Sequence, residues 1–341
     1  MNILIQDFFK EVKMSTNLTN DVVIFGLDNS KELSEQIGKV LKREIVPANK
    51  IVFADGERIL SSSITVRNKN VFIICNTSKP VNDNLMDLLI FVDSLKRASA
   101  KYINVVITYY GYARQDRKVN GREPISSKLI ADLLTIAGVT KIIAIDLHNP
   151  SIQGFFNIPV DDLRGQFIFS QELKSRKEKF VIVSPDHGGA VRARQLAELL
   201  QNEEEIAIID KRRTGPNKCE IMGVLGEVEN KNVVIFDDII DTGGTIINAV
   251  KALKEKGAKK VIVAATHGLF SRGFDMFENN DLVDEVIVSN STSQSQSLIG
   301  SNYKKLKVLS LAKFLALVIE ANINKTSITE VYNAYSKRNI K

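Results

Sequence analysis

The stretch VVIFDDIIDTGGT, residues 233–245, joins an apolar run to three acidic residues and two glycines. The run VVIF is mostly β-branched, which is typical of a buried strand. Asp237, Asp238 and Asp241 follow it, and burying unpaired carboxylates costs a large free energy. We therefore expect a group from outside the chain to pair with these acids.

Apolar runs of strand character recur along the chain and alternate with segments of helical periodicity. The strand-like runs cover residues 22–25, 71–75, 102–108, 141–146, 180–184, 206–210, 232–236, 261–266 and 285–289. Amphipathic helices are expected at 84–99, 126–138, 189–200 and 244–257. This alternation indicates an α/β fold with parallel sheets covered on both faces. Ligands in such folds bind where strands end and helices begin.

Two segments of similar pattern suggest that this arrangement is duplicated. GVTKIIAIDLH (138–148) and GAKKVIVAATH (257–267) each contain a helix-ending glycine, a basic turn, a strand and a histidine. They favour two related halves, with a coincidence of ordinary turn and strand sequences as the alternative. The chain has three histidines, His148, His187 and His267, each expected directly after a strand. Their position favours a role in a site, although a histidine is often only a structural hydrogen-bond donor.

Composition excludes several classes of protein. A length of 341 residues with 44% hydrophobic residues suggests two domains with packed cores, and excludes general disorder. The net charge of +6 suits an anionic ligand, and it equally suits a surface with scattered lysines. Cys75 and Cys219 lack paired spacing, which indicates a reducing compartment without a disulfide framework.

No segment has the pattern of a membrane or secretion signal. Charged residues interrupt the first residues, MNILIQDFFKEVK, so these do not form a signal-peptide core. The apolar segment 311–323 is too short for a membrane span and contains Lys313 and Glu320. A cytoplasmic location is expected, and residues 1–20 are expected to form a loosely ordered N-terminal extension.

The glycines of the opening stretch indicate a phosphate site. Thr242, Gly243, Gly244 and Thr245 can form a tight turn that presents backbone N–H groups and hydroxyls at the start of a helix. The neighbouring carboxylates can accept hydrogen bonds from sugar hydroxyls. A sugar phosphate is therefore the expected ligand. The alternative is a solvated turn that caps the helix, which accounts for Asp241 or Thr242 but not for the whole set.

Other segments admit two interpretations when each is taken alone. Taken alone, FADGER (53–58) is compatible with an exposed acidic turn, and YARQDR (112–117) with a solvated basic helix start. PDHGG (185–189) reads as an anion-binding turn or as simple helix initiation. DKRRTGPNK (210–218) is expected to form a mobile cationic loop, or else a solvated basic turn.

Taken together and in order, these motifs resemble those of the ribose-phosphate pyrophosphokinase family. The resemblance runs from about residue 22 to about residue 332 and includes the specific strings YGYARQDRK and IQGFF. The stretch VVIFDDIIDTGGT resembles the phosphoribosyl pyrophosphate loop of the type I phosphoribosyltransferase fold. Position 54 is Ala, where this family usually has Ser or another small residue.

The resemblance implies a fold and a reaction. The fold would be two related doubly wound parallel-sheet domains, at 21–163 on the ATP side and 164–341 on the ribose 5-phosphate side. The enzyme would transfer the diphosphoryl group of ATP to the anomeric hydroxyl of ribose 5-phosphate, with Mg²⁺ as cofactor. Its products would be 5-phosphoribosyl 1-pyrophosphate and AMP.

The resemblance also implies roles for individual residues. The residues expected to bind ATP are Phe53, Asp55, Glu57, Arg114 and Gln115. His148 and Asp186 would hold Mg²⁺, and Lys211 and Arg213 would form the catalytic pair on the mobile loop. The residues expected to bind ribose 5-phosphate are Asp237, Asp238, Asp241, Thr242, Gly243, Gly244 and Thr245.

Regulation and assembly are implied in the same way. The family resemblance suggests a homohexamer built from dimers, activated by phosphate and inhibited by ADP, with no nucleic-acid or membrane partner. Arg67, Ser327 and Thr329 are the candidate regulatory residues, although the ending TSITEVYNAYSKRNIK departs from the usual family pattern. Three alternatives remain: a non-catalytic regulatory homologue, a base-salvage phosphoribosyltransferase, and a protein that only senses phosphoribosyl pyrophosphate.

Overall fold

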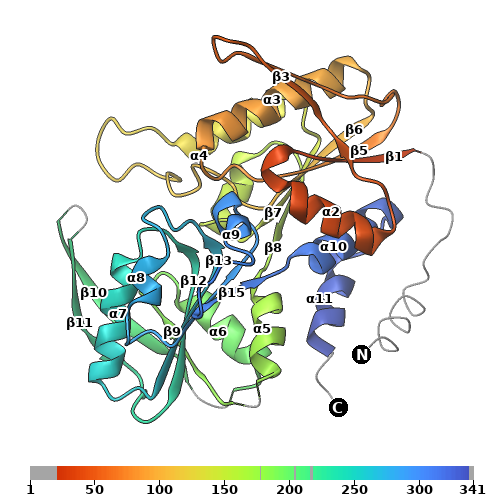
Figure 1. Ribbon diagram of the computed structural model, residues 1–341. Helices are drawn as coiled ribbons and strands as arrows, with labels where there is room; N and C mark the ends of the chain where they lie inside the picture. Colours follow the sequence, from red (N-terminus) through yellow and green to blue (C-terminus); the bar gives the residue numbers. More distant parts are fainter. Residues whose placement is uncertain (1–20, 177, 203–204, 216–217, 338–341) are drawn as a thin grey trace.

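The computed structural model describes residues 21–176, 178–202, 205–215 and 218–337, arranged as two α/β halves (Figure 1). The first half contains a fully parallel sheet of order β2-β1-β5-β6-β7-β8. Its strands are β1 (Val22–Gly26), β2 (Val46–Pro47), β5 (Asn70–Cys75), β6 (Tyr102–Ile107), β7 (Lys141–Ile145) and β8 (Val160–Leu163). A separate hairpin joins β3 (Asn49–Val52) to β4 (Arg58–Ser61).

The second half contains a sheet of order β11-β10-β9-β12-β13-β14-β15. All neighbours are parallel except β11, which pairs antiparallel with β10 at the edge. The strands are β9 (Val181–Ser184), β10 (Ala207–Gly215), β11 (Lys218–Leu225), β12 (Asn232–Ile240), β13 (Lys260–Gly268), β14 (Glu285–Ser289) and β15 (Leu306–Leu309). The prediction of a parallel α/β fold is confirmed.

The two sheets share one strand order when the hairpin β3–β4 and the edge strand β11 are set aside. In each sheet the second strand lies outside the first, and the following strands are added in sequence on the other side. The two related halves are thus confirmed, but the repeated segments that suggested them are not equivalent. Segment 138–148 contains β7, the fifth strand of its sheet, whereas 257–267 lies on β13, the fourth strand of the other. Ordinary turn and strand sequences account for that similarity.

The helices cover both faces of the sheets. They are α2 (Lys31–Leu41), α3 (Val81–Arg97), α4 (Ser126–Ala137), α5 (Gln166–Lys174), α6 (Ala190–Leu199), α7 (Gly244–Glu255), α8 (Asp275–Glu278), α9 (Ser293–Ser297), α10 (Ala312–Asn324) and α11 (Ile328–Lys337). The predicted helices correspond to α3, α4, α6 and α7. Sequence periodicity missed α10 because it is buried along most of its length and has little polar face.

One hydrophobic core is shared between the halves. It includes Phe72 and Val106 of the first sheet, Phe236 of the second sheet, and Phe169 and Phe314 of α5 and α10. Alternate strand residues face two further cores, one for each half, because successive side chains point to opposite sheet faces. The two halves are therefore packed through a common apolar layer.

The last helices return to the first half. Figure 1 shows α10 beside α2, and the two helices are in contact. Nζ of Lys141 donates to Oδ1 of Asn322 at 2.7 Å, and Oγ of Ser310 donates to Oε1 of Gln36 at 2.7 Å. The division at 163/164 stays a prediction, and the predicted extension 1–20 lies outside the described residues.

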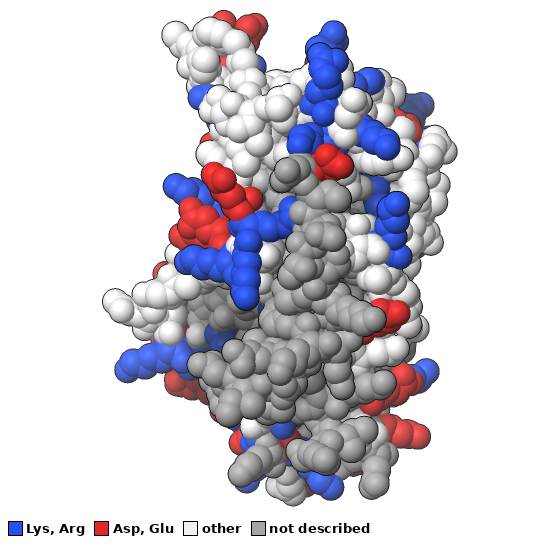
Figure 2. Space-filling model, turned by 90° about the vertical axis from the view of Figure 1, so that its right-hand side faces the viewer, with Lys and Arg blue, Asp and Glu red and all other residues white. Residues whose placement is uncertain are grey.

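The face seen in Figure 2 carries both positive and negative side chains. Figure 2 shows both Lys or Arg and Asp or Glu side chains on the part of this face that grey atoms do not cover. This mixture agrees with a net charge that comes from scattered residues. Within the described ranges, no helix is long and apolar enough to span a membrane.

Candidate active site

The acidic pair Asp237 and Asp238 lies within β12, not after it. The predicted strand ended at residue 236, but β12 continues to Ile240 because its backbone stays paired with β13, with Asp237 opposite Ala265. Asp238 is buried, with 4% of its surface exposed, and Asp237 is partly buried. Two adjacent carboxylates at the end of a central strand require compensating charge.

Arg192 of α6 supplies part of that charge. Its Nη1 atom lies 3.2 Å from Oδ1 of Asp237 and 3.0 Å from Oδ1 of Asp238. These acids therefore have a partner within the chain, and pairing with a group from outside stays a prediction. Arg192 lies in the first turn of α6, directly after the PDHGG turn. This cation was the sequence signal for a partner of the acids, and it was missed.

His148 supplies a second partner for the acidic pair. It follows β7 of the first half, and its Nδ1 atom lies 2.7 Å from Oδ2 of Asp238. Burial raises the pKa of Asp238, but the hydrogen bond with His148 and the charge of Arg192 outweigh burial and bring this pKa below its ordinary value. Burial and the neighbouring Asp238 charge raise the pKa of Asp237 well above its ordinary value.

The predicted metal pair, His148 and Asp186, is not joined by a contact in the described part of the chain. Asp186 is exposed, and its Oδ1 atom accepts a hydrogen bond from the N–H of Gly189 at 3.0 Å. Nearby, Nε2 of His187 lies 3.0 Å from Oδ1 of Asp210. Among the described residues, no group of three or more His, Cys, Asp or Glu side chains is arranged to hold a metal ion.

His267 lies inside β13, and not directly after a strand as predicted. It is buried, with 1% of its surface exposed, and its position on β13 is opposite Ile239 of β12. The other two histidines do follow strands, His148 after β7 and His187 after β9.

The predicted phosphate turn lies between β12 and α7. Gly243 has φ +81°, and a Cβ atom there would lie 2.7 Å from both Met276 and Phe277. Only glycine fits this position. Gly244 begins α7, and no side chain caps the helix at Gly243, which leaves first-turn N–H groups for an anion. Thr242, Gly244 and Thr245 are exposed.

Asp241 joins the turn to the first half. Its Oδ2 atom accepts a hydrogen bond from Nη2 of Arg114 at 2.8 Å, and its Oδ1 atom accepts one from Oγ of Ser271 at 2.5 Å. Burial raises the pKa of Asp241, but these hydrogen bonds and the charge of Arg114 lower it further than burial raises it. A residue predicted for ATP thus contacts a residue predicted for ribose 5-phosphate.

The remaining predicted ATP residues are dispersed. Phe53, Asp55 and Glu57 form the turn between β3 and β4, where the N–H of Phe53 donates to the carbonyl of Glu57 at 2.8 Å. Phe53 is 46% exposed. Within the described ranges, no hydrogen bond or ion pair joins this turn to Arg114 or Gln115, and Figure 1 shows the hairpin apart from the segment before α4. Oε1 of Gln115 accepts a hydrogen bond from Oγ of Ser126.

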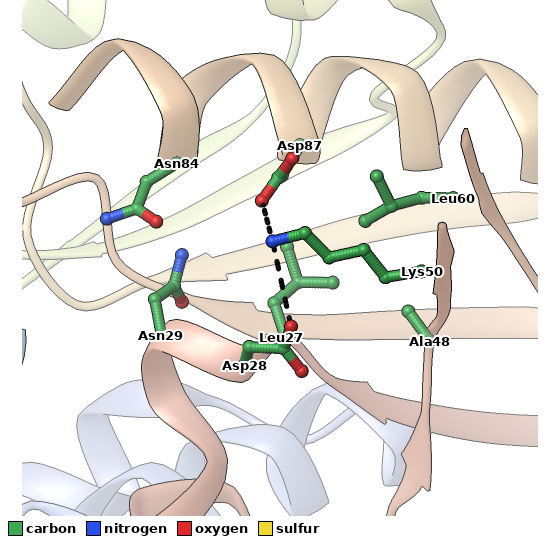
Figure 3. Close-up of a pocket in the computed structure, with 8 residues that line it drawn as sticks. All are labelled: Leu27, Asp28, Asn29, Ala48, Lys50, Leu60, Asn84 and Asp87. Carbon is green, nitrogen blue, oxygen red and sulfur yellow. Dashed lines mark hydrogen bonds and ion pairs between the residues drawn. The ribbon is translucent and has the colours of Figure 1, made fainter. Parts of the chain in front are cut away.

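The hairpin β3–β4 is fixed to α3 through Asp87. Lys50 of β3 lies 2.7 Å from Oδ2 of Asp87, and Nη1 of Arg58 in β4 lies 3.0 Å from Oδ1. Figure 3 shows Lys50 reaching Asp87 across a small pocket that Asn29 and Asn84 also line. The pocket has a structural role between the hairpin and α3, because its ionic groups are already paired with one another.

The predicted mobile loop at 210–218 is largely a β-hairpin. Lys211 and Arg213 belong to β10, which pairs antiparallel with β11 through register irregularities at Asp210/Lys211 and Arg213/Gly215. The strand that pairs with β10, β11, was not predicted from the sequence. Lys211 is partly buried, while the side chain of Arg213 lies outside the part that the structure describes.

The candidate regulatory residues lie on the surface. Nη1 of Arg67 donates to Oγ of Ser99 at 3.3 Å. Ser327 precedes α11, and its Oγ atom accepts a hydrogen bond from the N–H of Thr329 at 3.2 Å. These contacts are local and do not test the regulatory role, which stays a prediction.

Two family models match the chain in the order of its halves. The N-terminal domain of ribose phosphate pyrophosphokinase matches residues 22–138, and a phosphoribosyl transferase domain matches residues 163–291. A relative from Mycoplasmopsis pulmonis, named ribose-phosphate pyrophosphokinase, is 57% identical over 92% of this chain and 97% of its own. The chain belongs to the ribose-phosphate pyrophosphokinase family.

Further members of the ribose-phosphate pyrophosphokinase family agree. A relative of that name from Mycoplasma pneumoniae is 48% identical over 92% of this chain and 96% of its own. The crystal structure of phosphoribosylpyrophosphate synthetase from Mycobacterium smegmatis has a TM-score of 0.80 and 37% identity, over 90% of this chain and 100% of that chain. The family resemblance and the fold are confirmed, whereas the roles of single residues stay predictions.

Proposed function

We propose that the chain transfers the β,γ-diphosphoryl group of ATP to the anomeric hydroxyl of ribose 5-phosphate. The products are 5-phosphoribosyl 1-pyrophosphate, for nucleotide biosynthesis, and AMP. The observation that carries this proposal is the convergence of Asp237, Asp238 and the 241–245 turn at the end of β12, in a chain of this family. Sequence identity over nearly the whole chain supports the same reaction.

Ribose 5-phosphate binds at the end of β12 in this proposal. The N–H groups at the start of α7 take its phosphate, because a helix N-terminus attracts anions. Asp237 and Asp238 accept hydrogen bonds from its hydroxyls, and Arg192 offsets the negative charge of the two carboxylates.

ATP binds next to the sugar through Arg114 and Gln115. Phe53, Asp55 and Glu57 act on its adenine side, yet no hydrogen bond or ion pair joins their turn to Arg114 among the described residues. We propose that a neighbouring copy in a homohexamer built from dimers brings this turn to the nucleotide. The exposed apolar residues Val52 and Ile59, 55% and 45% exposed, suit such an interface.

Mg²⁺ is the proposed cofactor. It usually binds one or two carboxylates, with water and substrate phosphates completing its octahedral shell. The described residues suit that mode, since Asp186 is exposed and no group of three or more ligating side chains gathers around it. His148 and Asp186 are the proposed holders, with Nε2 of His148 left for this role because Nδ1 contacts Asp238. When bound, Mg²⁺ neutralises charge on the phosphate oxygens.

Catalysis rests on alignment and on charge neutralisation. The sugar hydroxyl attacks the β-phosphorus, and AMP leaves, so no protein nucleophile is required. Lys211 and Arg213 stabilise the negative charge that develops on the phosphates. A hairpin at the sheet edge can close over the substrates without disturbing the core.

Phosphate activation, ADP inhibition and a cytoplasmic location complete the proposal. Arg67, Ser327 and Thr329 are the proposed phosphate contacts. The non-catalytic alternative is less favoured, because Lys211, Arg213, His148 and Asp186 are all present.

The test is AMP release from ATP and Mg²⁺ by the purified chain, with and without ribose 5-phosphate, in phosphate-containing and phosphate-free buffers. Sugar-dependent AMP release with a phosphoribosyl pyrophosphate product supports the proposal. Binding of both substrates without AMP release in either buffer would favour the non-catalytic homologue. Equal rates in the two buffers would reject phosphate activation but not the proposed reaction.

A further inference from the structure

His267 connects the second half of the molecule to the turn that carries His148. Its Nε2 atom lies 3.1 Å from the carbonyl oxygen of Ile145 and 3.3 Å from that of Asp146. Its Nδ1 atom lies 2.9 Å from Oγ of Ser291. The ring also packs edge-on against Tyr109, with centroids 5.1 Å apart. Both nitrogens of this buried ring therefore have hydrogen-bond partners, and the ring has an aromatic neighbour.

The neighbours of the ring determine where its proton lies. Carbonyl oxygens only accept hydrogen bonds, so Nε2 must carry a hydrogen. Burial lowers the pKa of His267, which favours the neutral ring, and Nδ1 then accepts from the Ser291 hydroxyl. The Ser291 hydroxyl also lies 2.9 Å from the carbonyl oxygen of Thr266, so its single hydrogen has two possible acceptors. When this hydrogen goes to Nδ1, the Thr266 carbonyl keeps a donor, because Oγ of Ser289 donates to it at 2.6 Å. His267 is thus a donor to the first half of the molecule.

The turn that receives this hydrogen bond is strained. Asp146 has φ +42°, in the left-handed region that residues other than glycine adopt uncommonly. Its N–H donates to the carbonyl of Leu163 at 2.8 Å, and its Oδ2 atom accepts from the N–H of Gly165 at 3.1 Å. Thr266 of β13 also donates to Oδ2. Thr266 and His267 therefore hold the strained residue from the other half.

The same turn places His148 two residues later. His148 contacts Asp238 of β12, and β12 is paired with β13, where Ile239 lies opposite His267. These contacts form a closed cycle, which runs from His148 to Asp238, across the paired strands β12 and β13 to His267, and back to the turn. A shift of the turn would therefore change the distance and angle between His148 and Asp238.

We propose that His267 is a positioning residue for diphosphoryl transfer, which holds the 145–148 turn so that the His148 ring keeps its orientation on Asp238. This role rests on the proposed function. His267 itself touches no reacting group, and it acts through the carbonyl oxygens of Ile145 and Asp146.

A matched pair of variants tests this role. In His267→Gln the side-chain amide nitrogen takes a position similar to Nε2 and can still donate to the two carbonyls. In His267→Asn the shorter side chain reaches only the Nδ1 position. Both variants remove the ring contact with Tyr109. We expect kcat of the Asn variant to fall about tenfold or more and that of the Gln variant about threefold at most, with KM for both substrates changing less than about twofold.

Coupling to His148 separates positioning from general stability. In a His148→Ala background, His267→Asn should lower kcat less than about twofold further, because the group it positions is gone. Equal kcat losses in the Gln and Asn variants, or a full additional loss in the His148→Ala background, would overturn the proposal. A fall in kcat that follows a fall in melting temperature would also overturn it.

A second readout does not depend on turnover. The chain has only three histidines, so the ring signals of His148 can be resolved by nuclear magnetic resonance. We expect these signals to shift in His267→Asn and to stay near their original positions in His267→Gln. Unchanged His148 signals in the Asn variant would reject the positioning role even if the wild-type chain released no AMP. Absence of AMP release by the wild-type chain would reject only the proposed function.

Discussion

Nδ1 of His148 lies 2.7 Å from Oδ2 of Asp238, although 90 positions separate the two residues in the chain. The contact joins the end of β7 in the first half to β12 in the second half. Arg192 approaches the same carboxylate from α6 at 3.0 Å. A buried Asp238 is therefore held by two partners from different parts of the fold, and the site depends on how the two halves are packed.

Asp238→Asn should destabilise the fold more than Asp237→Asn. The low pKa of Asp238 reflects an ionised carboxylate held by His148 and Arg192 against the effect of burial, whereas burial and the Asp238 charge raise the pKa of Asp237. We expect a loss of about 1–3 kcal/mol in the unfolding free energy for Asp238→Asn and less than about 1 kcal/mol for Asp237→Asn. Urea unfolding at neutral pH measures both, and equal losses would contradict the assignment.

Asp162 should make stability depend on pH. Its Oδ1 atom accepts a hydrogen bond from the N–H of Leu147 at 3.1 Å, and burial raises its pKa to about 6. Because an unfolded Asp titrates near pH ~4, the stabilisation by the bound proton is complete below that pH and is lost as pH rises through about 6.

Asp162→Asn keeps the acceptor for Leu147 and removes this titration. At about pH 7 the variant should be more stable than the wild type by about 1–2 kcal/mol, and the difference should shrink toward about pH 4. Urea unfolding across this range gives the two curves. Parallel curves would show that Asp162 does not titrate with a raised pKa.

Gly243→Ala should disrupt the turn before α7. Its φ of +81° and the 2.7 Å approach of Met276 and Phe277 leave no room for a Cβ atom. We expect a loss of about 1–3 kcal/mol in unfolding free energy and a higher KM for ribose 5-phosphate. Gly244→Ala is the stability control, since a Cβ atom there meets nothing within 4 Å. A Gly243→Ala variant as stable as the control would contradict this reasoning.

Lys211→Ala should lower kcat by orders of magnitude and leave the unfolding free energy nearly unchanged. Lys211 lies on the hairpin β10–β11 and is not a member of the three hydrophobic cores, and its proposed role is to stabilise phosphate charge. Lys251→Ala is a suitable control, because Lys251 is exposed on α7 and pairs only weakly with Glu255 at 3.8 Å. A nearly wild-type rate for Lys211→Ala would remove Lys211 from the catalytic pair.

The equivalent strands β5 and β12 show how far pattern reasoning extends. Both are third in their sheets when the edge strand β11 is set aside, and both were predicted as strands from apolar runs. After β5 the chain continues with Asn76 and Ser78, which are buried and hydrogen-bonded to each other at 2.5 Å. After Phe236 the chain carries acids instead. The sequence predicted the candidate binding site after Phe236, whereas the closed polar arrangement after β5 is known only from the structure.

Edge elements were harder to predict than central ones. The strands β2, β8 and β15 are only 2, 4 and 4 residues long, so they offer few consecutive apolar residues. Without a continuous apolar run or a strong alternation, local pattern carries little signal. Lys211 and Arg213 were assigned to a mobile loop because their segment is rich in Lys, Arg, Gly and Pro, although β10 continues through them.

The amino-acid sequence by itself determined the α/β class, the central strands, the glycine turn before α7 and the family. Each of these depends on residues close together in the chain, where hydrophobic period and turn chemistry act locally. The tertiary structure alone decided that Arg192 and His148 share Asp238, and that His267 donates to the turn at Ile145 and Asp146. Those partners lie on separate elements, and only the packing of two sheets against a common core brings their polar atoms within hydrogen-bond distance.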